Sequence, residues 1–158
     1  MFLPTYIWLV PALAAVPLIR SDLRSRRIGT GWLGAFGAAA LLTAFAVYRW
    51  SDVLLHAGIN SLLTLLSGGC LAGYLRLRYG RRARLTHYFG TGDWVFLLTL
   101  APMFSPADFL RLQIVACLLS LAGWLGRNRR RSTVPFAGVL ALTFLGFILL
   151  KIIRSWTL

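Results

Sequence analysis

Apolar blocks separated by short clusters of arginine dominate this sequence. The blocks run for about 17–20 residues, and a helix needs about 20 to cross roughly 30 Å of hydrocarbon. Of the 158 residues, 58% are hydrophobic, and the mean hydropathy is +0.73. A soluble domain is closer to half apolar. The pattern predicts an all-α polytopic membrane protein, a bundle of about six transmembrane helices, with residues 1–158 forming one membrane-embedded domain.

The distribution of basic residues predicts how the bundle is oriented. The expected spans are roughly 3–20, 30–48, 54–75, 90–104, 107–126 and 134–153. Thirteen of the seventeen basic residues flank or fill the first, third and fifth connections. They are Arg20, Arg24, Arg26, Arg27, Arg76, Arg78, Arg81, Arg82, Arg84, Arg127, Arg129, Arg130 and Arg131. Because positive loops stay on the cytoplasmic side, we expect these connections in the cytoplasm and both termini outside.

Two features near the ends of the chain bear on this orientation. The first block has no basic residue before it, which is the opposite of a secretory signal peptide, so we expect a retained helix. Lys151 and Arg154 lie near the outer end and oppose the orientation weakly. Long basic side chains there can extend to the interface while their stems stay in apolar surroundings.

The charge also limits the expected partners. The net charge of +13 comes from sixteen Arg and one Lys against four Asp and no Glu. The basic residues lie between apolar blocks and not on a soluble face, so we expect contact with anionic lipid headgroups and no nucleic acid. Cys70 and Cys117 lie inside apolar blocks without a CxxC or Cys/His cluster. We therefore expect them to be small packing residues and expect no metal site.

Two of the four aspartates are explained by helix starts. Asp108 follows Ser105 and Pro106, which are typical of an N-cap and a first helical position. Asp52 follows Ser51 at the start of the third span, close to Arg49, where a negative charge favours a helix N-terminus. Both lie on the outer side and need no further role.

Asp22 and Asp93 differ, because the topology brings both to the cytoplasmic face. Singly, Asp22 could pair with a neighbouring arginine and Asp93 could cap a helix. Taken together, the two aspartates favour a functional site over two separate structural roles, because ionisable groups at membrane depth are costly and usually functional. From Asp93 to the Ser105 turn there are about a dozen residues, or ~18 Å of helix, which is too short for a full crossing. We expect Asp93 in a partly watered recess below the surface, with Gly90 and Gly92 keeping the preceding backbone irregular and close-packed.

Two converging carboxylates can share one proton, because two like charges a few ångström apart do not ionise together easily. The ionised carboxylate takes a proton from water, and the protonated one polarises a peptide carbonyl. This is aspartic-type peptide hydrolysis, and it needs no cofactor.

Three segments resemble motifs of one family. GTGD (90–93) is similar to the GxGD signature of intramembrane aspartyl proteases, and DLRSRRI (22–28) resembles the first-aspartate motif of type IV prepilin peptidases. VPFAGVLAL (134–142) is similar to the run that opens the last helix in that family. The motifs come in the family's order over essentially the whole chain. The chain resembles the short members that lack the N-methyltransferase domain.

The resemblance implies a multi-pass endopeptidase of the inner (plasma) membrane with its active site toward the cytoplasm. Its substrates would be type IV prepilin-like proteins, cleaved at the end of a basic leader. By the same match Asp22 and Asp93 form the catalytic pair, and Gly90 and Gly92 belong to the active-site loop.

The sequence departs from the family pattern at three places. Gly29–Thr30 stands where Pro-Asn is usual, Val95 stands where Lys is usual, and residues 137–139 replace Gly-Pro-Phe. A second interpretation therefore stays open: a catalytically divergent membrane protein that binds or scaffolds pilus or secretion components. A proton-relay transporter is a third, although no inverted repeat is evident. The substrate and the oligomeric state are left open.

A few other residues complete the expectations. His87, six residues before Asp93, is more typical of an interfacial side chain than of a catalytic helper, and His56 has no partner evident in the sequence. Trp94 adjoins Asp93 and could shape the cleft. Small residues spaced for close helix packing are Gly69 and Gly73 on the third span and Gly34, Ala35, Ala38 and Ala39 on the second.

Overall fold

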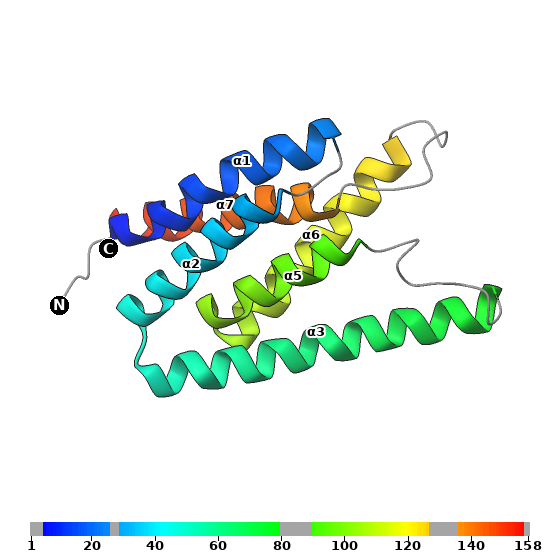
Figure 1. Ribbon diagram of the computed structural model, residues 1–158, viewed down its shortest axis with the longest axis horizontal. Helices are drawn as coiled ribbons and strands as arrows, with labels where there is room; N and C mark the ends of the chain where they lie inside the picture. Colours follow the sequence, from blue (N-terminus) through cyan, green and yellow to red (C-terminus); the bar gives the residue numbers. More distant parts are fainter. Residues whose placement is uncertain (1–4, 26–28, 80–89, 127–135, 157–158) are drawn as a thin grey trace.

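The computed structural model describes residues 5–25, 29–79, 90–126 and 136–156, and every element within them is helical (Figure 1). Their order is η1 (Thr5–Trp8), α1 (Leu9–Ser25), α2 (Thr30–Val47), α3 (Trp50–Tyr79), α5 (Thr91–Leu100), η2 (Ala101–Met103), α6 (Pro106–Gly126) and α7 (Phe136–Trp156). The expected all-α fold is confirmed. His87 lies outside the described residues.

Three of the described helices, α2, α3 and α6, are long and apolar enough to cross a membrane. Helix α7 has a shorter apolar stretch at Gly138–Ile153. The chain is therefore a membrane-embedded helical protein, as its sequence predicts. The expected fourth span is the shortest, because α5 has 10 residues and continues only as the 3-10 turn η2. Helix α3 has 30 residues, or about 45 Å, and is longer than the 54–75 expected for it.

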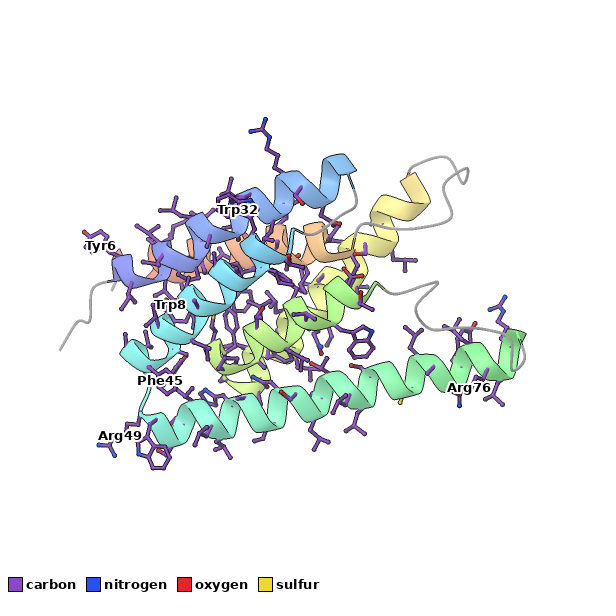
Figure 2. The ribbon with its side chains drawn as sticks, viewed as in Figure 1. Tyr6, Trp8, Trp32, Phe45, Arg49 and Arg76 are labelled. Atoms are coloured by element: carbon purple, nitrogen blue, oxygen red, sulfur yellow. The ribbon has the colours of Figure 1, made fainter. Side chains whose placement is uncertain are left out.

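Successive helices alternate in direction along the bundle (Figure 1). One end of the bundle therefore collects the C-termini of α1, α3 and α6 together with the N-termini of α2, α5 and α7. We call it the arginine-rich end, because the chain around these termini carries thirteen of the seventeen basic residues. Arg76 lies toward this end of α3, and Arg49 lies next to the opposite end (Figure 2).

Aromatic side chains fill the centre of the bundle. Phe36 of α2 stacks against Phe96 of α5, with 4.9 Å between ring centroids, and meets Phe144 of α7 edge to face at 5.5 Å. Phe104, which follows η2, also meets Phe144 edge to face, at 6.0 Å. All four rings are fully buried. In a bilayer the hydrophobic effect contributes little to helix association, because the lipid is also apolar, so packing of side chains matters more. Aromatic pairs of this kind add to that packing. They fix α2, α5 and α7 against one another.

The close packing expected of the small residues is confirmed at Ala39, which is buried, and was wrong for the three glycines and the two cysteines. Gly34, Gly69 and Gly73 face open space, and Cys70 and Cys117 are exposed. The physical reason is visible on α3, whose buried positions Val53, Asn60, Thr64, Gly68 and Leu75 follow one helical stripe. Positions 69, 70 and 73 lie off that stripe. The close approaches instead involve Gly68, against Trp94, and Gly37, against Thr99.

Candidate active site

Asp22 is held by a residue far away in the sequence. It lies in the last two turns of α1, and its side chain is buried, with 7% exposed. Its Oδ2 accepts a hydrogen bond from the backbone N–H of Gly138 at 2.6 Å. Gly138 is the third residue of α7, and the first amides of a helix have no acceptor within it. Asp22 therefore satisfies the start of α7, and the amide orients the carboxylate.

This bond joins two of the three segments that resemble family motifs. Asp22 opens the segment 22–28, and Gly138 lies in the segment 134–142. They are 116 positions apart. A bond to a backbone amide has no residue-type signature, so sequence reasoning missed Gly138 as a contact of Asp22. Only the resemblance of 134–142 pointed to this segment.

Asp93 lies at the start of α5 and is half-buried. Its Oδ2 accepts a hydrogen bond from the N–H of Gly90 at 3.0 Å, and its own N–H donates to the Gly90 carbonyl at 3.1 Å. As the third helical residue, its carboxylate also lies where the helix dipole favours negative charge. The interpretation of Asp93 as a helix cap is confirmed, and it is compatible with a second role.

The two glycines before Asp93 do different things. Gly90 is the N-cap in an extended conformation, at φ −66° and ψ 145°. A Cβ added there would lie 3.2 Å from Oδ2 of Asp93, so the carboxylate closes over a position without a side chain. Gly92 is already helical, because α5 begins at Thr91. The expectation of irregular backbone up to Asp93 was therefore wrong at Gly92.

The structure brings Asp22 and Asp93 to the same end of the bundle. Helices α1 and α5 are both packed against α2 and α7, so the two aspartate-bearing helices share their neighbours. In Figure 1 the end of α1 and the starts of α5 and α7 all lie at the arginine-rich end. That the two carboxyls face each other across a cleft stays a prediction.

The positions that depart from the family pattern also lie at this end. Val95 follows Asp93 by two residues, and its side chain is 46% exposed. A residue there projects outward from the bundle and not into the core. Gly29 is the N-cap of α2 and, like Thr30, is exposed. These two departures therefore change the surface around the helix starts. The third, at residues 137–139, includes the buried Gly138, whose N–H donates to Asp22. The Pro that is usual at this position in the resembled family has no N–H, so the bond depends on this departure.

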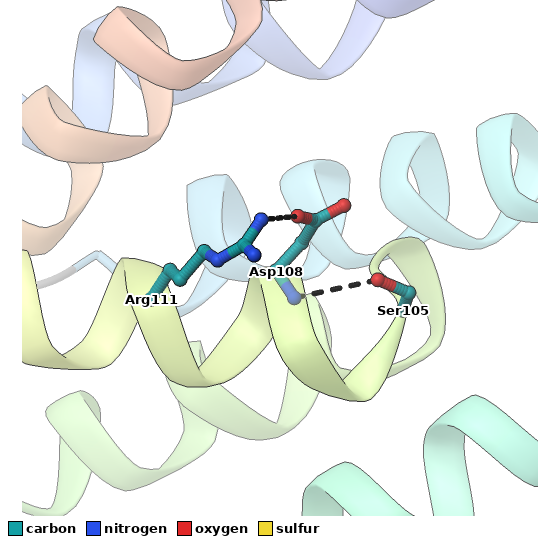
Figure 3. A network of polar contacts seen from close by, with 3 residues as sticks. All are labelled: Ser105, Asp108 and Arg111. Atoms are coloured by element: carbon teal, nitrogen blue, oxygen red, sulfur yellow. Dashed lines mark hydrogen bonds and ion pairs between the residues drawn. The ribbon is translucent and has the colours of Figure 1, made fainter.

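The other two aspartates act as the sequence predicts. The N–H of Asp108 donates to Oγ of Ser105 at 3.3 Å, and the Asp108 carboxylate pairs with Arg111 at 3.3 Å (Figure 3). Asp52 lies in the first turn of α3, which begins at Trp50. Both are at the end of the bundle opposite Asp22. Within the described ranges, no group of three potential metal ligands is found.

A polar cluster that the sequence did not reveal lies at that opposite end. The ammonium of Lys151 lies over the ring of Trp8 at 4.5 Å and over that of Phe104 at 5.6 Å. His56, expected without a partner, meets the Tyr48 ring edge to face at 5.0 Å. Burial, and then the charge of Asp108, raise the pKa of Tyr48 above its ordinary value. These contacts close this end with aromatic rings, and none involves Asp22 or Asp93.

Comparison of the chain with protein-family models, with curated proteins and with solved structures finds no match.

Proposed function

We propose that this chain is a membrane aspartyl endopeptidase of the prepilin-peptidase type. It cleaves type IV prepilin-like proteins at the end of their basic leader, at the cytoplasmic face of the inner membrane. The observation that carries the proposal is the buried 2.6 Å bond between Asp22 and the Gly138 amide. It brings together the first and third segments that resemble the family, at the bundle end where Asp93 of the second segment lies in the first turn of α5. Gly138 stands where the family usually has Pro, so the support comes from the proximity of the segments and not from the bond as a family feature.

The proposed chemistry uses the two carboxyls as one unit. One carboxylate accepts a proton from a water molecule while that water attacks the scissile carbonyl. The other, protonated carboxyl polarises the carbonyl oxygen and later supplies a proton to the leaving amine. In both residues Oδ2 accepts an N–H from the start of a helix, which fixes the orientation of each carboxyl. The residues that titrate are a coupled pair, so any pH profile belongs to both.

One observation favours the second candidate function, a scaffold without catalysis. Val95 occupies the position where the resembled family usually has Lys, and it is exposed beside Asp93. A scaffold would need this surface and would not need either carboxyl. The two functions therefore differ in their dependence on Asp22 and Asp93.

Co-expression with prepilin-like proteins from the same genome, scored by loss of the leader on a gel, tests the proposal. Asp22→Asn and Asp93→Asn are each expected to abolish cleavage, because an amide can neither accept the proton of water nor donate one as an acid. The matched controls are Asp52→Asn and Asp108→Asn, which leave cleavage near the parent level. Chelators and reagents for serine or cysteine have no effect.

Cleavage of the leader by the Asp93→Asn variant would contradict the proposed enzymatic function. So would a parent protein that cleaves no substrate while all four variants behave alike. In either case the scaffold takes its place, and it predicts equal binding of pilus or secretion components by all five proteins.

The orientation has its own test. The charge distribution predicts that reporter domains fused after Arg84 and after Arg129 are cytoplasmic. A periplasmic signal at either position would show that the bundle has the opposite orientation. Asp22 and Asp93 would then lie on the wrong face for a leader that stays in the cytoplasm.

A further inference from the structure

The short helix α5 is held by α3 at its first turn. The indole of Trp94, the residue after Asp93, lies against Gly68 in the middle of α3. A Cβ built on Gly68 would come within 1.7 Å of Cη2 of Trp94 and 2.5 Å of Cζ2. Atoms cannot approach so closely, so the ring occupies the space that any other residue at position 68 would fill. The fit depends on a glycine at this position.

The fit is specific to Gly68. Gly69, its neighbour, and Gly73, one turn further, have open space where a Cβ would be. Gly68 is buried on the stripe of α3 that faces the bundle, and Gly69 and Gly73 are exposed. The chain therefore contains a matched control for the contact one residue away.

A second contact from α3 holds the far end of α5. The Nδ2 of Asn60 donates to the carbonyl of Ala101 at 2.7 Å and to that of Phe104 at 2.9 Å. Asn60 is fully buried, and these carbonyls belong to η2 and the residue that follows it. The turn after α5 is therefore held against α3 by two hydrogen bonds.

The two contacts agree in register. From Asn60 to Gly68 is eight residues, or about 12 Å of helix, and from Trp94 to Ala101 is seven residues, or about 10.5 Å. The order is reversed, as antiparallel neighbours require. Between these points α5 buries Phe96, Leu97 and Leu100. Its first turn has no such apolar residue before Trp94, and its N-cap is Gly90, which has no capping side chain.

We propose that Gly68 and Trp94 are positioning residues that seat the first turn of α5 on α3 and thereby set the place of the Asp93 carboxyl. This rests on the proposed function for its catalytic consequence. A displacement of Trp94 would move Asp93 directly, because the two residues are adjacent and the bonds between Asp93 and Gly90 lie in the same turn. An indole that cannot pack against position 68 displaces the first turn of α5. Small misplacements of a reacting group lower turnover strongly.

The experiment compares Gly68→Ala, Gly69→Ala and the double variant Gly68→Ala/Trp94→Phe in the full chain. The smaller ring removes the outer indole atoms that a Cβ at position 68 would meet. Two readouts are used: hydrogen exchange of the backbone over residues 91–96, and kcat and KM for leader cleavage. We expect Gly68→Ala to speed exchange there and to lower kcat roughly ten- to a hundredfold with little change in KM. Gly69→Ala should match the parent, and the double variant should recover much of both losses.

Each outcome decides the matter. Equal exchange in Gly68→Ala and Gly69→Ala would overturn the contact, whatever the activity. Faster exchange with unchanged kcat would overturn the positioning role. Failure of the double variant to recover either readout would show that Gly68→Ala acts through general loss of folding, which also rejects the proposal. A parent that cleaves nothing contradicts the proposed function, and the exchange data then still decide whether the contact seats α5.

Discussion

The two ends of the bundle use aspartate in different ways. At the end where α6 begins, Asp108 is bound by Ser105 and Arg111, both within three residues of it (Figure 3). At the arginine-rich end, Asp22 is bound by an amide 116 positions away. The first arrangement forms wherever the local sequence makes a helix start. The second exists only when α1 and α7 are packed together, so it ties a carboxylate to the tertiary structure.

The largest expected effect separates the chemical role of Asp22 from its structural role. Asp22→Asn keeps a carbonyl oxygen that can accept the Gly138 N–H, whereas Asp22→Ala leaves that buried amide without an acceptor. We expect both variants to lose cleavage by about 10²–10⁴-fold or more. Only Asp22→Ala should also lose about 1–3 kcal/mol of stability. Thermal unfolding in detergent, measured beside cleavage, checks this. Equal stability of the two variants would mean that the amide has another acceptor.

A smaller effect is expected at the turn between α5 and α6. Asn60→Leu removes the donor to the carbonyls of Ala101 and Phe104, which are both in buried residues. We expect a loss of about 1–3 kcal/mol, since hydrogen bonds within membrane proteins are individually worth no more than those in water. Unfolding by a denaturing detergent measures it, with the exposed Leu62→Ala as a control expected to stay near the parent. A loss of stability no larger than that of the Leu62→Ala control would show that the hydrogen bonds of Asn60 do not stabilise the fold.

The N-cap of α6 should contribute less. Ser105→Ala removes the acceptor for the Asp108 N–H and should lower stability by about 1 kcal/mol. Cleavage at a temperature well below unfolding should not change, because this end is remote from Asp22. Ser105→Asp, which can still cap, is the matched variant and should stay close to the parent. A drop in turnover at full folding would link the two ends in a way that the contacts do not show.

The smallest effect is expected for Arg111→Ala. The Arg111 side chain is 70% exposed, so water and salt screen its pair with Asp108. Surface pairs of this kind are worth about 0–1 kcal/mol, and we expect less than about 0.5 kcal/mol. Unfolding at low and at high salt tests it, because a real contribution shrinks as salt rises. A loss as large as that of Ser105→Ala would show that the pair is shielded from solvent.

Much of the fold could be predicted from the sequence because its signals are local. Apolar length predicts the spans, and Ser105, Pro106 and Asp108 together predict the start of α6. The short fourth span was predicted from the distance between Asp93 and Ser105. Packing was predicted poorly, because which of several adjacent glycines faces a neighbour depends on helix rotation. Gly69 and Gly68 differ by one position, about 100° around the helix, and only Gly68 meets Trp94.

The candidate site could be predicted in part. Asp22 and Asp93 were singled out by residue type, depth and topology, and the structure brings both to one end of the bundle. The partner of Asp22 could not be predicted, because a backbone N–H is present at almost every residue. The cluster around Lys151 was missed for a similar reason: Trp8, Phe104 and Lys151 are far apart in the chain, and only the packing of η1, η2 and α7 brings the rings under the ammonium.

The distance along α3 from Trp50 to Gly68 bears on how deep Asp93 would lie in a bilayer. Its first residue, Trp50, is highly exposed, as expected for an aromatic anchor at the membrane surface. Gly68 follows 18 residues later, or about 27 Å along the axis, which is close to the far boundary of a hydrocarbon layer of about 30 Å. If α3 crosses the layer upright from Trp50, then Asp93, the neighbour of the Trp94 that lies against Gly68, would lie near that boundary. Under the proposed function, this depth would place the peptide bond that is cut where a charged leader leaves water and the apolar part of the substrate enters lipid.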